Sequence, residues 1–160
     1  MTIEELTQFA NEFLRKHYDM ALDIPIIINR RLRSTMGAFI RDEDSPHSIE
    51  ISGNILKYGA KSAILDVLYH ELIHYALFIR GEPFRDGQVH FEAELRRYGV
   101  SSTSSNFIGR KCEFTCDGCG DSIDTTTQAI AKNPKAYKSR CCHAELIYVG
   151  ERIYDGTEVV

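Results

Sequence analysis

Three residues near the middle of the chain have the types and spacing of a metal-dependent hydrolytic site. His70, Glu71 and His74 form an HExxH motif. Residues four apart on a helix lie on one face, so both imidazoles can bind one zinc ion. Glu71 lies one position further round, beside the open coordination position, where a carboxylate can take a proton from water. The motif therefore predicts a catalytic zinc with Glu71 as general base.

The element that must carry this motif is a helix predicted over Lys61–Arg80. Its apolar residues cover most of the helix circumference, namely Ile64, Leu65, Val67, Leu68, Leu72, Ile73, Ala76 and Leu77. Such a helix is typically buried against other elements. Gly81 follows its last turn, where glycine most easily adopts a left-handed C-terminal cap. Burying two histidines and a glutamate without partners is costly, which favours a metal site.

A catalytic zinc needs a third protein ligand, and the segment after this helix offers candidates. They are His90, Glu94, Glu92 and Asp86. A turn at residues 86–87 precedes a helix predicted over Val89–Tyr98. His90 is the first choice, because neutral imidazole is the commonest zinc ligand. Glu94 is the second choice, and the other two carboxylates remain alternatives.

The segments before the motif helix predict a small sheet beside it. Thr2–His17 has the apolar spacing of an amphipathic helix. Asp23–Asn29 is short and β-branched, which is typical of a strand. Met36–Arg41 and Ser48–Ser52 flank a polar turn and predict a hairpin. We therefore expect an α+β fold with a small sheet packed on the buried motif helix.

Cysteine usage and a polar linker divide the chain into two predicted domains. Ser101–Asn106 is polar and featureless, and all five cysteines come after position 110. We expect one domain over residues 1–100 and a separate zinc-ribbon module over residues 107–150. An odd number of clustered cysteines in a reducing compartment favours metal binding over disulfides.

The cysteine spacing predicts a second, structural zinc ion in this module. The chosen ligands are Cys116 and Cys119 of a CxxC knuckle, followed by the adjacent pair Cys141 and Cys142. The second knuckle is not a clean CxxC, so His143 and Cys112 remain alternatives to Cys141. Metal binding would supply folding energy that so small a core lacks.

Charge and composition limit the partners. The net charge of the 160 residues is −4, which argues against a strongly nucleic-acid-binding surface overall. Residues 107–143 nevertheless carry a net charge of +2, with basic residues Arg110, Lys111, Lys132, Lys135, Lys138 and Arg140. This local excess allows contact with DNA without requiring it. No apolar run approaches the length of a membrane span, and the N-terminus is not a secretory signal, so we expect a cytoplasmic protein without a membrane partner.

Taken together, these features resemble the SprT-like family. The resemblance runs from about Leu6 to Gly150 and rests mainly on HELIHY at residues 70–75 and on a cysteine ribbon ending in CHAELIYVG. It implies a zincin-like metallopeptidase domain with zinc at His70 and His74 and Glu71 as general base. Members of the family resemble the catalytic domain of Spartan, a DNA-dependent metalloprotease that degrades proteins crosslinked to DNA. The resemblance therefore also implies a ribbon that helps to contact DNA.

Two positions depart from the family pattern. The family places its third histidine a few residues before a phenylalanine, whereas here His90 directly precedes Phe91. The final knuckle of the ribbon normally reads CxxC, and Ser139 stands where its first cysteine is expected.

We therefore expect a zinc-dependent metallopeptidase that acts on a protein substrate and is stimulated by DNA. The alternative is a metal-binding, DNA-associated adaptor or regulator without significant proteolysis. The intact Glu71 favours the peptidase, because a binding module has no chemical need for a base at that position.

Overall fold

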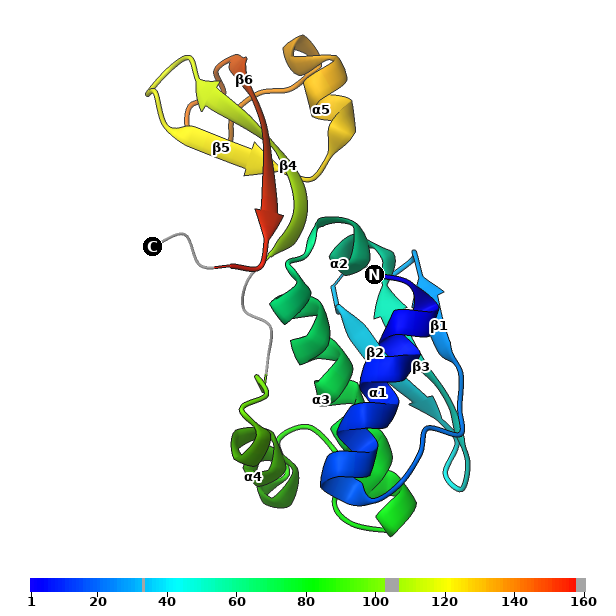
Figure 1. Cartoon of the computed structure of the whole chain (residues 1–160). Helices are drawn as coiled ribbons and strands as arrows, with labels where there is room; N and C mark the ends of the chain where they lie inside the picture. Colours follow the sequence, from blue (N-terminus) through cyan, green and yellow to red (C-terminus); the bar gives the residue numbers. More distant parts are fainter. Residues whose placement is uncertain (33, 103–106, 158–160) are drawn as a thin grey trace. The chain divides into compact units, whose positions relative to one another are not determined.

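The computed structural model describes residues 1–32, 34–102 and 107–157, and the chain divides into two compact units (Figure 1). The first unit comprises Met1–Phe107 together with Asp155–Val160, and the second comprises Ile108–Tyr154. Residues 103–106 of the predicted linker lie outside the described residues.

The first unit combines helices with a three-stranded sheet. Its elements in chain order are α1 (Ile3–Tyr18), β1 (Ile26–Asn29), β2 (Gly37–Arg41), β3 (Pro46–Ser52), α2 (Gly53–Tyr58), α3 (Lys61–Arg80) and α4 (Val89–Tyr98). The strand order is β1-β3-β2, so β2 lies at an edge of the sheet. β2 pairs with β3 antiparallel, as the predicted hairpin requires, whereas β1 pairs with β3 in parallel. The predicted mixture of helices and a small sheet is confirmed.

Helix α1 begins with a capping box. The backbone N–H of Glu5 donates to the Thr2 hydroxyl at 3.2 Å, and the Thr2 N–H donates to the Glu5 carboxylate at 2.7 Å. Leu6 and Leu14 on the apolar face are fully buried. The helix packs on α3, so it covers one side of the element that carries the motif (Figure 1).

Helix α3 is the central element of the first unit. It contacts α1, α2, α4 and the strands β2 and β3. Leu68, Leu72 and Ile73 are fully buried, as the apolar pattern predicts. Gly81 caps the helix with φ +69°, a left-handed conformation that glycine adopts without strain. The motif is thereby held on a rigid helix between the sheet and α4.

Helix α3 also bears on the expectation about membranes. By length and composition alone this helix could cross a membrane, so the expectation that no apolar segment approaches that length was wrong. Half of its apolar window is buried inside the protein, which is also found for core helices of soluble proteins, so this is weak evidence for a membrane span. The cytoplasmic location stays a prediction.

The second unit, which we call the cysteine unit, is a small sheet with short helices. Its elements are β4 (Ile108–Cys116), β5 (Ser122–Thr125), α5 (Gln128–Lys132), the 3₁₀ helix η1 (Pro134–Ala136) and β6 (Leu146–Asp155). The strand order is β5-β4-β6, and β4 pairs with β5 antiparallel. Cys112, Phe114 and Cys116 alternate along β4 and are buried. β6 leaves the apolar side chains of Ile147 and Val149 exposed, so the core of this unit is small.

Candidate metal centres

Two histidines and a carboxylate converge beside the buried face of α3. The Nε2 atoms of His70 and His74 lie 3.1 Å apart. One Asp86 carboxylate oxygen, Oδ1, lies 3.1 Å from the first Nε2 atom and 3.3 Å from the second. A tetrahedral zinc ion with bonds of about 2.0–2.1 Å holds its ligand atoms roughly 3.3 Å apart. The spacing of these three atoms fits such an ion.

The outer nitrogens of both rings are held by backbone carbonyls. His70 Nδ1 lies 2.9 Å from the Ser101 carbonyl oxygen, and His74 Nδ1 is hydrogen-bonded to the Phe84 carbonyl oxygen. A carbonyl can only accept, so each Nδ1 must donate, and each neutral ring presents a lone pair at Nε2. Two lone pairs and a carboxylate oxygen then face one another, an arrangement that a shared cation stabilises. The donor set therefore fits a divalent metal ion such as zinc.

The turn after α3 places Asp86 at this site. Gly87 adopts φ +79°, and its backbone N–H donates to the Glu92 carboxylate at 3.0 Å. This bond ties the turn to the first helical turn of α4. Glu92, one of the alternative ligands from sequence, thus positions the turn that carries Asp86 and does not join the histidines.

The structure does not bring His90, the ligand favoured from sequence, to the two motif histidines. Its Nε2 atom lies 3.6 Å from the Glu82 carboxylate. Glu94 also lies elsewhere, since it accepts a hydrogen bond of 2.8 Å from the Tyr18 hydroxyl. The reason is local. His90 and Glu94 belong to α4, which begins at Val89, so the path of this helix fixes where their side chains lie. Asp86 belongs to the turn before α4, and this turn brings it back toward α3.

Glu71 lies beside this group and is buried. Its carboxylate accepts a hydrogen bond from the backbone N–H of Phe39 in β2. Burial raises the pKa of Glu71 to about 7; the nearby Asp86 adds to the rise, while His70 and the Phe39 N–H oppose it. Burial likewise lowers the pKa of His74. A neutral imidazole and a carboxyl group that titrates near pH 7 are thus both found at the site.

A shallow cleft of about 320 Å³ gives access to these groups. Strand β2 lines it with Gly37 and Phe39, α3 lines it with Glu71 and His74, and the turn before α4 contributes Asp86. We call this hollow the motif cleft. A backbone segment at a sheet edge and the candidate metal site therefore share one opening.

Gly37 is a site residue that the sequence reasoning missed. A Cβ atom at this position would lie 2.7 Å from Val67 Cγ1 and 3.0 Å from Glu71 Cγ, both closer than ordinary contact. Only glycine lets β2 approach α3 closely enough to receive the Glu71 side chain. The available signal was a glycine at the start of a predicted strand, which often marks a close approach of backbone.

We expect Gly37→Ala to destabilise the first unit by about 1–3 kcal/mol, the usual cost of overpacking a tight contact. Urea unfolding of the metal-free chain measures this cost. Gly53→Ala is the matched control, because its added methyl group meets mainly the flexible side chain of Arg30. Equal stability of Gly37→Ala and wild type would contradict the close approach.

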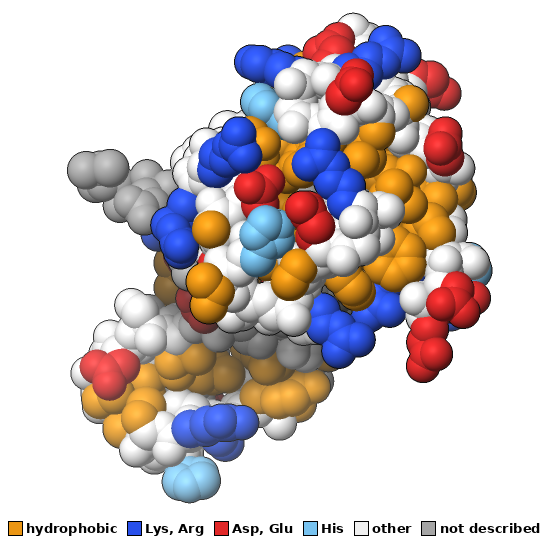
Figure 2. Space-filling model, turned by 90° about the horizontal axis from the view of Figure 1, so that it is seen from below, with side chains coloured by type: hydrophobic (Ala, Val, Ile, Leu, Met, Phe, Trp, Pro, Cys, Tyr) orange, Lys and Arg blue, Asp and Glu red, His pale blue; other side chains and the backbone are white. Residues whose placement is uncertain are grey.

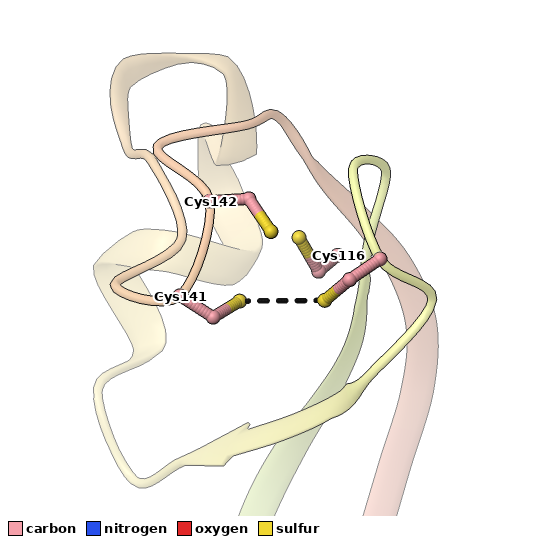
Figure 3. A group of neighbouring side chains, drawn as sticks. Cys116, Cys141 and Cys142 are labelled. Atoms are coloured by element: carbon pink, nitrogen blue, oxygen red, sulfur yellow. Dashed lines mark hydrogen bonds between the residues drawn. The ribbon is translucent and has the colours of Figure 1, made fainter.

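The cysteine unit holds a second candidate metal centre. The four ligand sulfurs chosen from sequence lie within 4.8 Å of one another, and those of Cys119 and Cys141 are 3.6 Å apart. In Figure 3 the labelled side chains of Cys116, Cys141 and Cys142 point toward one another, the first from the end of β4 and the other two from the loop before β6. Zinc–thiolate bonds of about 2.3 Å place sulfurs roughly 3.8 Å apart, so the cluster fits one tetrahedral ion.

The alternative ligands of this unit lie outside the cluster. Cys112 is buried in β4, and His143 is exposed with φ +50°. Gly118 permits the close approach of the two loops, because a Cβ atom there would lie 2.8 Å from Cys142 Cβ.

Ser139 stands at the position where the family has a cysteine, and its side chain is hydrogen-bonded to the cysteine cluster. Its buried hydroxyl oxygen lies 3.2 Å from Cys116 Sγ and accepts from the backbone N–H of Ala144 at 3.1 Å. Hydrogen bonds from the Ser139 hydroxyl and from the Cys119 backbone lower the pKa of Cys116 to about 6. The pKa values of the neighbouring Cys119 and Cys142 thiols are raised, because nearby cysteine thiols and burial oppose their ionisation. A metal ion would therefore have to displace their protons when it binds.

Carboxylates offset part of the positive charge of the cysteine unit. Three of the six basic residues expected to contact DNA pair with carboxylates, which reduces the free positive charge. These pairs are Arg110–Glu151 at 3.2 Å, Lys111–Asp124 at 3.3 Å and Lys138–Glu145 at 3.7 Å. On the face shown in Figure 2, Lys and Arg side chains are interspersed with Asp and Glu side chains.

Comparison with known proteins places this chain among relatives of one kind. The SprT-like family model matches residues 3–105. A protein named Protein SprT-like from Streptococcus mutans serotype c is 25% identical over 146 residues, which cover 88% of this chain and 94% of the relative. One of the same name from Bacillus cereus is 22% identical over 152 residues, covering 95% and 85%. Another from Staphylococcus epidermidis is 31% identical over 85 residues, covering 53% and 54%. Because the family match spans more than half of its residues, this chain belongs to the SprT-like family.

Proposed function

We propose that this chain is a zinc-dependent metallopeptidase whose metal is held by His70, His74 and Asp86. The observation that carries the proposal is the convergence of two imidazole lone pairs and a carboxylate beside the buried Glu71. Membership of the SprT-like family is consistent with this activity. The arrangement of an HExxH helix beside a sheet edge supports the proposal of a zincin-like site.

The chain's own residues have distinct roles in this proposal. When bound, zinc would polarise the scissile carbonyl and make water a better nucleophile. Glu71 takes the proton from the attacking water and returns it to the leaving amine. Burial raises the pKa of Glu71 to about 7 in the metal-free chain, and a bound cation would lower it and favour the ionised form that accepts a proton. The Phe39 N–H orients the Glu71 carboxylate for this transfer.

The free edge of strand β2 is an argument that the substrate is a protein. The outer edge of this strand has no neighbouring strand in the described sheet, and four of its residues, Gly37, Ala38, Phe39 and Arg41, line the motif cleft. An extended peptide can add to such an edge through backbone hydrogen bonds. This would place a peptide bond across the opening beside Glu71.

We further propose that the four-cysteine cluster holds a structural zinc ion and that the cysteine unit contacts DNA. The spacing of the sulfurs supports the first part. The second is supported by the sequence resemblance and by the basic residues of the unit. The second candidate function is a DNA-associated adaptor that binds metal without cleaving peptides, and the buried, oriented Glu71 favours the peptidase over it.

The test is cleavage of proteins by the full chain. An unstructured protein such as β-casein and a DNA-binding protein are incubated with the zinc-loaded chain, with and without single-stranded DNA. We expect fragments that disappear when a chelator removes the metal and return when zinc is restored. Faster cleavage in the presence of DNA would support stimulation by DNA.

The other outcomes are equally decisive. Cleavage that survives complete removal of the metal would contradict a metallopeptidase. A metal-loaded chain that cleaves neither protein, with or without DNA, would leave the adaptor as the better account.

A further inference from the structure

Two arginine side chains line the motif cleft beside the candidate metal site. Arg41 ends strand β2, and its guanidinium carbon lies 4.5 Å from the centroid of the Phe84 ring and 5.6 Å from that of Phe78. Arg85 lies 5.7 Å from the same Phe84 ring. Stacking on aromatic rings fixes the plane of a guanidinium and leaves its N–H groups free. The ring of Phe84 therefore supports two cations at one wall of the cleft.

The donors of these two groups are largely unused. Arg41 donates one hydrogen bond, of 3.1 Å, to the Asp42 carbonyl oxygen. In the described part of the chain, neither Arg41 nor Arg85 has a carboxylate within ion-pair distance. A guanidinium carries five N–H donors, so several remain for a ligand.

The charge of the cleft also favours an anion. Asp86 and Glu71 are the carboxylates that line the cleft, and a divalent metal ion would balance them. Arg41 and Arg85 would then remain uncompensated, so the metal-loaded cleft has a positive excess. A partly enclosed positive site concentrates anionic ligands.

We propose that Arg41 and Arg85 form a carboxylate-binding subsite, which selects peptides that carry a carboxylate next to the scissile bond. The planar fork of arginine matches the two oxygens of a carboxylate. The carboxylate can belong to an Asp or Glu side chain or to the C-terminus of the peptide. This inference rests on the proposed peptidase function and names the substrate class of the same cleft.

The first test measures binding without turnover. Fluorescent peptides are titrated into the zinc-loaded full chain carrying Glu71→Gln. One pair of peptides differs by Glu against Gln in the middle, and a second pair differs by a free against an amidated C-terminus. Charge-assisted hydrogen bonds predict roughly 10–100-fold tighter binding of the acidic member. The pair that shows the preference identifies the source of the carboxylate.

Variants assign this preference to the arginines. Arg41→Gln is expected to remove most of the preference, and Arg41→Lys to keep part of it, because lysine keeps the charge without the fork. Arg15→Gln on α1 is the matched control, since Arg15 is exposed and does not line the cleft, and it should leave the preference unchanged. If both Arg41→Gln and Arg41→Lys keep the full preference for acidic peptides, the proposal is overturned. The peptide carboxylate would then be bound by the metal ion and not by the arginines.

Steady-state cleavage by the chain with Glu71 intact provides the second test. The subsite predicts that Arg41→Gln raises KM for acidic peptides by roughly 10-fold or more with little change in kcat. An equal fall in kcat for acidic and neutral peptides would overturn it and indicate an arginine that stabilises the transition state. Arginines that bind single-stranded DNA but do not distinguish the peptides would overturn it as well.

The inference and the peptidase fail in different ways. Cleavage of acidic and neutral peptides at equal efficiency would remove the subsite and keep the peptidase. Selective binding of acidic peptides without any cleavage would remove the peptidase and keep the subsite.

Discussion

Glu71→Gln is expected to abolish peptide cleavage while both metal centres stay loaded. An amide cannot accept the proton of the attacking water, and loss of a general base typically lowers kcat by about 10²–10⁴-fold. Glutamine has nearly the same shape, and its carbonyl can still accept the hydrogen bond of the Phe39 N–H, so the site should keep its geometry. Steady-state rates and metal analysis of the same preparation measure the two results.

The matched control for this substitution is Glu12→Gln. Glu12 is an exposed residue of α1, so the same change of charge there should leave the rate unaltered. Turnover of Glu71→Gln close to the wild-type rate would contradict the assigned role. Loss of zinc from the variant would show that Glu71 acts through the metal and not as a base.

The same variant has a second consequence, for stability. The pKa of Glu71 is about 7 in the fold and about 4.5 when unfolded. The unfolded chain therefore releases this proton first as the pH rises, so the free energy of unfolding falls between pH 4.5 and 7. Above pH 7 ionisation of the buried Glu71 lowers the free energy of unfolding by its full amount, about 3 kcal/mol.

Removing this carboxylate should make the metal-free chain more stable at pH 8 but not at pH 4. Urea unfolding of the chelated wild type and Glu71→Gln at both pH values measures the difference. A difference that is independent of pH would contradict the raised pKa.

Asp86→Ala is expected to release the metal of the motif cleft, whereas His90→Ala is expected to retain it. The first change removes one of three converging donor atoms, and the second removes a ring that lies beside Glu82. Removal of a residue that only hydrogen-bonds to a metal ligand typically lowers metal affinity by roughly 10–100-fold. Loss of Asp86, which is itself a proposed ligand, should lower zinc affinity by more than this. Zinc retained per chain after dialysis against a competing chelator measures this effect.

Retention in the cysteine unit serves as the internal control. Wild type and His90→Ala should keep two zinc ions per chain, and Asp86→Ala should keep the one among the cysteines. The opposite pattern, with zinc lost in His90→Ala and kept in Asp86→Ala, would restore the ligand set favoured by the sequence.

The motif helix could be predicted well because its information is local. The apolar pattern and Gly81 gave the same bounds, Lys61–Arg80, that the structure shows. Spacing on one helix is enough to bring His70 and His74 together. The proposed third ligand depends instead on the path of a turn, and ligand preference alone pointed to His90. The geometry of residues 84–87 brings Asp86 to the histidines, and no periodic pattern encodes that path.

The pairing of strands that are distant in the sequence could not be predicted either. The hairpin of β2 and β3 follows from neighbouring segments, but the parallel pairing of Ile26 with Ile49 joins segments separated by another strand. The contact of Gly37 with Glu71 depends on how closely the sheet approaches α3. In the cysteine unit the composition indicated the ligand cluster, while the hydrogen bonds of Ser139 required the folded loops.

The central claim is that His70, His74 and Asp86 share one metal ion beside Glu71, and anomalous scattering at the zinc edge tests it most directly. Crystals of the full zinc-loaded chain should show a peak within about 2.0–2.2 Å of both Nε2 atoms and of an Asp86 carboxylate oxygen. A zinc peak found only among the cysteine sulfurs, or one bound by His90 in place of Asp86, would contradict the account.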